Sequence, residues 1–176
     1  MLPLPKHSAR TALVLLSALA ARLVAGETLL DFEPGFDLKT VETRDAEVTL
    51  HGSPPATSLE VKTGTTERWP GITLKPGRGV WNLSGAARLA LDVENVGEKS
   101  LTIHCRMDSP ADGNRVYYQE STQVGPGERA TFRVNIRRRL PSAFREKLFA
   151  MRGYPGGLLA EQGIDPAKVD AILIFV

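Results

Sequence analysis

The chain has 176 residues, which is enough for one domain, or for one domain and a targeting segment. Its composition, 42% hydrophobic and 24% charged, is that of a globular protein and argues against a disordered chain or a coiled coil. The single cysteine excludes an intramolecular disulfide and any zinc site built from several cysteines. Sixteen Gly and twelve Pro favour a turn-rich protein, and a net charge of +2 argues against a strongly cationic nucleic-acid binder.

The first 26 residues have the pattern of a secretory signal peptide. Lys6 and Arg10 supply a positive flank, and residues 11–21 form an apolar run that is too short to span a membrane. Ala18-Leu19-Ala20 and Val24-Ala25-Gly26 both fit the rule for cleavage after small residues, and we favour the later site because a strand-like segment follows it. The alternatives are a buried amphipathic helix or an anchor that is never cleaved.

Removal of this segment changes the charge of the protein. Its three basic residues account for the excess, since 19 basic and 20 acidic residues remain, a net charge of −1. Long-range attraction to nucleic acid then has no support. We expect residues 27–176 to form one secreted, periplasmic or cell-surface domain, a monomer without nucleic-acid or membrane partners.

The rest of the sequence alternates apolar and polar residues over short runs, as strands with one buried and one solvent-exposed face do. These runs are centred on Val48–Leu50, Leu59–Val61, Ile72–Leu74, 87–94, 101–108 and 130–136. Pro-Gly dipeptides separate many of them, and Asn95-Val96-Gly97-Glu98 is typical of a hairpin between two of the strands. The pattern predicts an all-β fold, an antiparallel β-sandwich or jelly roll.

Two helical elements and one two-sided strand complete this prediction. Residues 142–150 are expected to form one short helix, and 165–168 a helical turn. Residues 171–176 are apolar on both faces, so this strand should be central or covered. We interpret a sequence that stops in such a strand as a fragment of a longer protein; the alternative is that this strand simply completes the sheet.

No catalytic motif stands out. The chain has no nucleophile elbow, phosphate-binding loop or metalloprotease helix, and no spacing singles out a pair of carboxylates for glycoside hydrolysis. Cys105 falls on the buried face of its strand, which indicates a structural thiol. We therefore predict no catalytic residue and no required cofactor.

Two further segments allow either a ligand-binding or a purely structural interpretation. The stretch 108–114 is rich in the oxygen ligands that calcium prefers, but it lacks a helix-loop-helix spacing and is typical of a tight turn. Arg137-Arg138-Arg139 has the charge to hold an anion, although so short a run is usually a solvated turn.

Aromatic and polar side chains suggest sugar binding, because sugars pack their C–H faces on rings and offer hydroxyls to Arg, Asp and Asn. Trp69 is in a loop, where exposure and rim packing are equally expected, whereas Trp81 is expected to pack against the core. Our candidate carbohydrate-binding residues are Trp69, His104, Arg106, Asp108, Asn114 and Tyr117. In this hypothesis Arg106 and Asp108 hold hydroxyls, and Trp69 or Tyr117 stacks on the ring; for His104, a solvated surface residue is the plainer interpretation.

Several segments together resemble a known module. They are Leu29-Leu30-Asp31-Phe32-Glu33, Trp69-Pro70-Gly71-Ile72-Thr73-Leu74, Trp81-Asn82-Leu83-Ser84, 91–97, 105–108, 151–155 and 164–169. In this order they resemble the N-terminal carbohydrate-binding-like, galactose-binding-like jelly-roll module that precedes the catalytic barrel in β-agarases of glycoside hydrolase family fifty. The first segment resembles the opening strand of such jelly rolls.

The resemblance implies a secreted, non-catalytic β-sandwich that contacts galactan-type, agarose-like polysaccharide and packs on a hydrolase barrel. Some relatives hold a structural calcium through an acidic residue of the opening strand, here Glu33, with a further acidic ligand in a closing strand that would follow Val176. The alternatives are a purely structural module that braces an attached barrel, and glycoside hydrolase activity in a portion missing from this chain.

Overall fold

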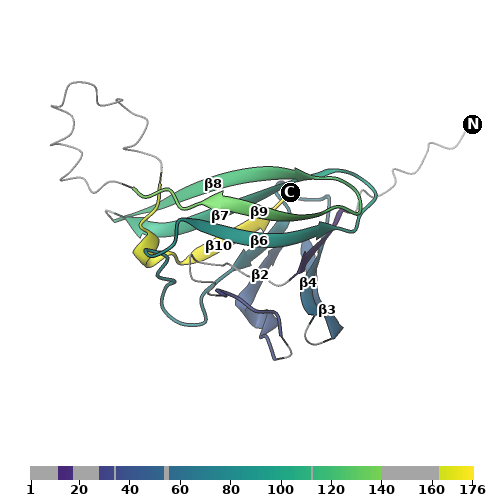
Figure 1. The fold of residues 1–176 in the computed structure, drawn as a ribbon, viewed down its shortest axis with the longest axis horizontal. Coiled ribbons are helices and arrows are strands. Elements are labelled where there is room, and N and C mark those ends of the chain that lie inside the picture. The colour runs from purple at the N-terminus through teal and green to yellow at the C-terminus, as the bar shows by residue number, and fades with distance from the viewer. Residues whose placement is uncertain (1–11, 18–27, 34, 54–55, 112, 140–162) are drawn as a thin grey trace, which may run out of the picture.

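The protein is an all-β sandwich of two five-stranded sheets, as the sequence predicts (Figure 1). The computed structural model describes residues 12–17, 28–33, 35–53, 56–111, 113–139 and 163–176. Within these residues every ladder between strands is antiparallel. The fold-class prediction is confirmed.

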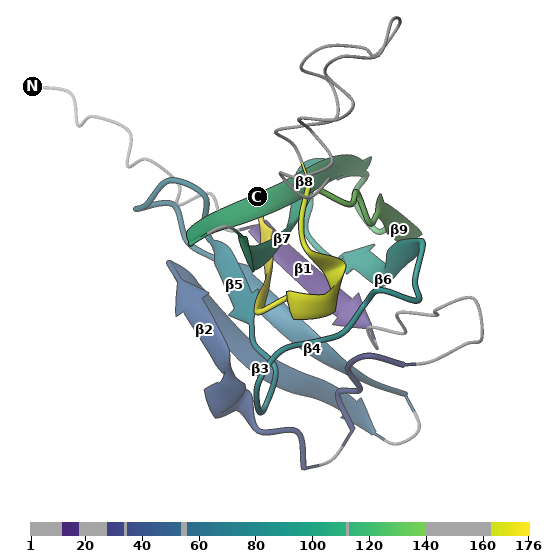
Figure 2. The same cartoon turned by 90° about the vertical axis from the view of Figure 1, so that its left-hand side faces the viewer.

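Sheet A has the strand order β3-β4-β1-β6-β9. Its strands are Ala46–Ser53 (β3), Ala56–Thr63 (β4), Ala12–Ser17 (β1), Arg88–Asn95 (β6) and Arg129–Asn135 (β9). Figure 2 shows β1 between β4 and β6, in the middle of this sheet.

Sheet B has the strand order β2-β5-β10-β7-β8. Its strands are Val41–Arg44 (β2), Gly71–Leu74 (β5), Ala171–Phe175 (β10), Leu101–Ala111 (β7) and Asn114–Val124 (β8). Two single-turn 3-10 helices, Leu38–Thr40 (η1) and Pro166–Lys168 (η2), precede β2 and β10.

The core lies between the sheets and follows from the period-two pattern. Leu89, Leu91 and Val93 of β6 are buried, as are Ile103, Cys105 and Met107 of β7. Their alternate neighbours are left on the outer faces, since successive side chains of a strand point to opposite sides. Polar side chains are therefore expected on the outer face of each sheet, and apolar side chains found there point to a binding surface.

Several local predictions are confirmed. Six of the strands fall on the alternating runs, and Asp165 caps η2 by accepting a hydrogen bond from the Ala167 amide. β10 is central in sheet B, between β5 and β7. Trp81 is partly buried and packs against the core, as expected.

Two local predictions are wrong, and a third covers too many residues. Asn95–Glu98 is no hairpin, because β6 and β7 belong to different sheets. The side-chain Nδ2 of Asn95 instead donates to the Lys99 and Val124 carbonyls and stabilises this crossover. The tight turn predicted at 108–114 is narrower than expected: β7 runs to Ala111, β8 starts at Asn114, and these two residues are already paired. Residues 29–33 form no strand: Phe32 is buried against Phe36, but no ladder includes the segment.

The predicted helix at 142–150 and the resemblance segment at 151–155 lie outside the described residues. In the described part of the chain, no helix has the length and apolar character that crossing a membrane requires. The signal peptide stays a prediction, although part of its apolar run forms the backbone of β1.

Candidate functional site

The outer face of sheet B carries the candidate site, and the strand registers decide which side chains meet there. One row of neighbours across the strands is Arg44, Gly71, Phe175 and His104. The next row, two residues along each strand, is Thr73, Leu173, Arg106 and Gln119. Neighbours in a row lie within side-chain contact, so the two rows build one continuous surface.

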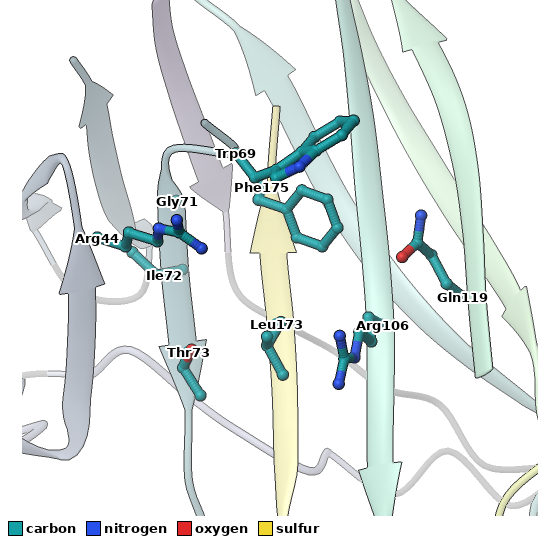
Figure 3. Close-up of a pocket in the computed structure, with 9 residues that line it drawn as sticks. All are labelled: Arg44, Trp69, Gly71, Ile72, Thr73, Arg106, Gln119, Leu173 and Phe175. Atoms are coloured by element: carbon teal, nitrogen blue, oxygen red, sulfur yellow. The ribbon is translucent and has the colours of Figure 1, made fainter. Parts of the chain in front are cut away.

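A hollow of about 230 Å³ opens between these rows (Figure 3). It is lined by Arg44, Trp69, Gly71, Ile72, Thr73, Arg106, Gln119, Leu173 and Phe175. Figure 3 shows the rings of Trp69 and Phe175 at one end of the hollow and the Arg106 guanidinium beside Leu173 further along β7 and β10. The lining thus combines apolar and hydrogen-bonding side chains, and in the described part of the chain it includes no carboxylate.

Trp69 and two further rings form an aromatic platform. Trp69 is 56% exposed, and its ring meets those of His104 and Phe175 edge-on, with centroids 5.7 and 5.8 Å away. His104 and Phe175 stack almost in parallel, 5.0 Å apart. Burial of an apolar ring in the core would stabilise the fold, so a large exposed indole supported by two other rings is typical of a binding surface.

The backbone of Trp69 is unusual as well. Its φ of 60° lies in the left-handed region, which is costly for a bulky residue. Asp45 holds the preceding loop in place: its carboxylate accepts hydrogen bonds from the Thr66 and Glu67 amides, and the Val176 amide bonds the Pro70 carbonyl beyond Trp69. The loop thus holds Trp69 in a strained backbone conformation, with its exposed ring in the lining of the hollow.

Arg106 is held in place by a buried carboxylate. The Asp108 side chain is only 4% exposed and accepts two hydrogen bonds from Arg106, at 2.6 and 3.0 Å, and one from Arg115 at 2.9 Å. Arg115 also donates to Asp170, and its hydrogen bond to Asp108 is the main reason that the pKa of Arg115 is raised. Both oxygens of Asp108 are therefore engaged with arginines.

Tyr117 also contacts the Arg106 guanidinium. The central carbon of that group lies 4.0 Å from the centroid of the Tyr117 ring, a cation–π arrangement. Nε and Nη2 of Arg106 donate to Asp108, and Nη1 has no acceptor among the described residues, so it can donate to a ligand. Gln119 completes this end of the hollow, with its Nε2 3.1 Å from Nδ1 of His104.

Gly71 makes room for the hollow. A Cβ atom at this position would overlap the Ile174 carbonyl oxygen and lie 2.6 Å from Phe175 Cα. Any larger residue would push β5 away from β10, because the contacting atoms are mainly backbone. Gly71 is thus required by the close approach of β5 to Ile174 and Phe175 of β10.

Most predicted site residues come together here. Trp69, His104, Arg106, Asp108 and Tyr117 share the outer face of sheet B, with Trp69 and Arg106 in the lining itself. Asn114 pairs with Ala111 at the far end of the β7–β8 hairpin and is not in the lining. The alternation of β7 was the signal for His104, Arg106 and Asp108.

Sequence reasoning missed Arg44, Thr73, Gln119, Leu173 and Phe175. Leu173 and Phe175 alternate with the buried Ile172 and Ile174, so the sequence predicts that they share the outer face of their strand. The sequence does not predict that they lie close to β7, since the pairing of distant strands is set by the whole sheet.

The described residues give little support for a metal-binding site or a reactive cysteine. They contain no group of three or more His, Cys, Asp and Glu placed to hold a metal ion. Glu33 is exposed, and a calcium there stays a prediction. Cys105 is fully buried, and this burial, with the nearby Glu120 charge, raises the pKa of its thiol far above the usual range. It is the structural thiol that the sequence predicts.

Two agarases share this fold. A structure described as that of an exo-beta-agarase superposes with a TM-score of 0.59 at 15% identity, over 84% of this chain and 22% of its own. The agarase AgWH50C superposes with a TM-score of 0.56 at 14% identity, over 84% of this chain and 21% of its own. The chain therefore spans about a fifth of the length of these neighbours. No protein-family model and no curated protein matches the sequence.

Proposed function

We propose that this chain is a secreted, non-catalytic carbohydrate-binding module of a longer glycoside hydrolase, and that it binds a neutral galactan-type polysaccharide in the hollow of sheet B. The observation that carries the proposal is the exposed, strained Trp69, set edge-on against Phe175 and His104 beside a fixed arginine. The agarase neighbours support the enzyme context, and the small share of their length that the chain spans supports a module.

The hollow suits a sugar because it combines rings with hydrogen-bond donors. The C–H face of a pyranose packs on an aromatic ring, and burial of that face gives most of the affinity. Arg106 Nη1, the Thr73 hydroxyl and the Gln119 amide lie within the same lining and serve the hydroxyls. In this arrangement Asp108 is a positioning residue for Arg106, since its own oxygens are occupied.

The charges favour a neutral glycan over a polyanion. Both arginines of the lining already have a carboxylate partner: Arg44 donates to Glu67 at 3.0 Å, and Arg106 to Asp108. An anionic substituent would have to compete with these pairs, whereas a hydroxyl accepts from the remaining N–H groups without breaking them. Affinity should therefore depend little on salt concentration.

Affinity electrophoresis in agarose gels tests the proposal. The full chain should be retarded. Trp69→Ala should raise the dissociation constant by about 30-fold, because a central aromatic residue contributes about 2 kcal/mol to binding. Arg106→Gln should weaken it as well, since the planar group over Tyr117 is lost. The matched controls are Leu50→Ala and Arg133→Gln, which replace exposed residues of sheet A.

Retardation that is unchanged in Trp69→Ala would rule out this site. Absence of retardation on agarose and on other neutral galactans would favour the second candidate, a module that braces an attached hydrolase domain. The same surface supports that candidate, because Trp69, Leu173 and Phe175 offer apolar area to a neighbouring domain as readily as to a sugar. In that case Trp69→Ala would lower the stability of the attached domain instead. Reducing-sugar release by the purified chain would contradict both candidates.

A further inference from the structure

The hollow of sheet B can hold only part of a polysaccharide. Its volume of about 230 Å³ is below the roughly 300–1,000 Å³ of pockets that hold a drug-sized ligand, so it has room for a short stretch of sugar. A polymer bound there continues onto the neighbouring outer face of the sheet. The side chains that flank the hollow therefore decide in which direction the polymer lies.

Tyr117 is a second exposed ring on the same face, outside the lining of the hollow. Four large hydrophobic side chains of the described residues are exposed, and Trp69 and Tyr117, at 56% and 54%, are the aromatic ones. Tyr117 adjoins the hollow through two of its lining residues. It lies two residues from Gln119 on the outer face of β8, and its ring contacts the Arg106 guanidinium.

The strand registers give the separation of the two rings along the sheet. Trp69 contacts His104 of β7, and Tyr117 lies opposite Asp108 of the same strand, four residues away from His104. A strand rises about 3.3 Å per residue, so the two rings are about 13 Å apart along β7, a length that about three sugar units cover. One sugar unit therefore cannot contact both rings, whereas a short oligosaccharide can.

The surface between the two rings is uncharged along β8. Gln119 and Ser121 follow Tyr117 on the outer face of this strand. Ser121 lies opposite His104, in the row that Trp69 contacts. Amide and hydroxyl groups bond to sugar hydroxyls as donors or acceptors. A polymer that lies along β7 and β8 thus meets a ring at each end and hydrogen-bonding groups between them.

The surface towards β2 lacks these features. Neither β2 nor β5 contains an aromatic residue. The charged side chains on that side form exposed ion pairs, Arg44 with Glu67 and Lys75 with Glu42. A neutral polymer would gain no stacking there and would displace water from these charges, which costs free energy. The direction along β7 and β8 is therefore favoured over the direction across the sheet.

We propose that Tyr117 is a second stacking site, and that the module binds about three consecutive sugar units laid along β7 and β8 from Trp69 to Tyr117. The proposal rests on the proposed function, because it extends the same binding site. In this arrangement Tyr117 contacts the ligand itself, in addition to Arg106. Affinity then depends on the length of the sugar chain.

Isothermal titration calorimetry with the disaccharide, tetrasaccharide and hexasaccharide of agarose tests this on the full chain. The dissociation constant should fall about 10-fold from the disaccharide to the tetrasaccharide, because only the longer ligand covers both rings. It should then change less than about 2-fold to the hexasaccharide. Tyr117→Ala should abolish the gain with length and leave the disaccharide affinity unchanged, whereas Trp69→Ala should weaken binding of all three ligands.

Further variants separate stacking from positioning of the arginine. Tyr117→Phe keeps the ring and should keep the gain with length, while Tyr117→Leu keeps bulk without a flat face and should lose the gain. If Tyr117→Ala weakened the disaccharide as much as the tetrasaccharide, the ring would only position Arg106, and the proposal would be overturned. Glu42→Gln, on the β2 side of the same face, is the matched control and should change no affinity. A selective loss for the tetrasaccharide in that control would place the polymer across the strands instead.

The second stacking site and the sugar site itself fail in different ways. Absence of binding to all three oligosaccharides would overturn both. Disaccharide binding that depends on Trp69 but does not strengthen with chain length would overturn the second stacking site alone. Tyr117→Ala should melt at the wild-type temperature, because the residue is exposed.

Discussion

The outer faces of the two sheets differ in how they use charge. On sheet A, charged side chains form pairs between neighbouring strands in which at least one partner is exposed, such as Lys62 with Glu47 and Glu94 with Arg129. On sheet B, the Asp108 carboxylate is buried beneath the surface and holds two arginines at once. Exposed pairs contribute little to stability or shape, whereas a buried carboxylate fixes its partners. Sheet B has exposed pairs as well, such as Arg44 with Glu67, so the buried Asp108 carboxylate is the feature that distinguishes the two faces.

The largest expected effect comes from removal of that carboxylate. Asp108→Ala should lower the free energy of unfolding by about 2–4 kcal/mol, because Arg106 and Arg115 lose a buried partner. Glu94→Ala on sheet A should cost less than about 1 kcal/mol, since Arg129 is exposed. Urea denaturation of both variants measures the difference, and equal losses would remove the contrast between the faces.

A smaller effect is expected where the sheet itself limits side-chain size. Gly71→Ala should destabilise the protein by about 1–3 kcal/mol and weaken agarose retardation, because the new Cβ would collide with the backbone of β10. Gly77→Ala is the matched control: its Cβ would meet open space, so its stability should stay within about 0.5 kcal/mol of wild type. If both variants unfold at the same urea concentration, the close approach at Gly71 carries no cost.

The smallest effect concerns Glu120, at the junction where β8 meets β9. Burial alone would raise its pKa, but hydrogen bonds from the Tyr118 hydroxyl and from Asn135 outweigh burial and lower it. A lowered folded-state pKa means that the carboxylate adds stability above the ordinary value of 4.5, and that this stability is lost as the pH falls through the folded pKa. The stability difference between wild type and Glu120→Gln should therefore shrink between pH 7 and pH 3 in urea titrations. A constant difference would contradict this.

The sequence predicted the strands well because period-two alternation is a local property. The burial of Cys105 and the outward position of Arg106 both follow from it. Alternation does not say which strands pair, and for this reason the sequence predicts a hairpin at Asn95–Glu98, where the chain crosses between sheets. The hollow escaped prediction for the same reason, since Arg44, Phe175 and Arg106 meet only through the registers of four strands.

The position of β10 also bears on how the hollow would respond to a ligand. Its Ile172 and Ile174 are locked into the core, and the intervening Leu173 and Phe175 form the floor of the hollow. A floor residue cannot shift without disturbing close-packed neighbours on the other side of the same strand. The floor is thus preorganised, and ligand binding should cost little conformational entropy there. We expect it to leave the backbone of sheet B where it is.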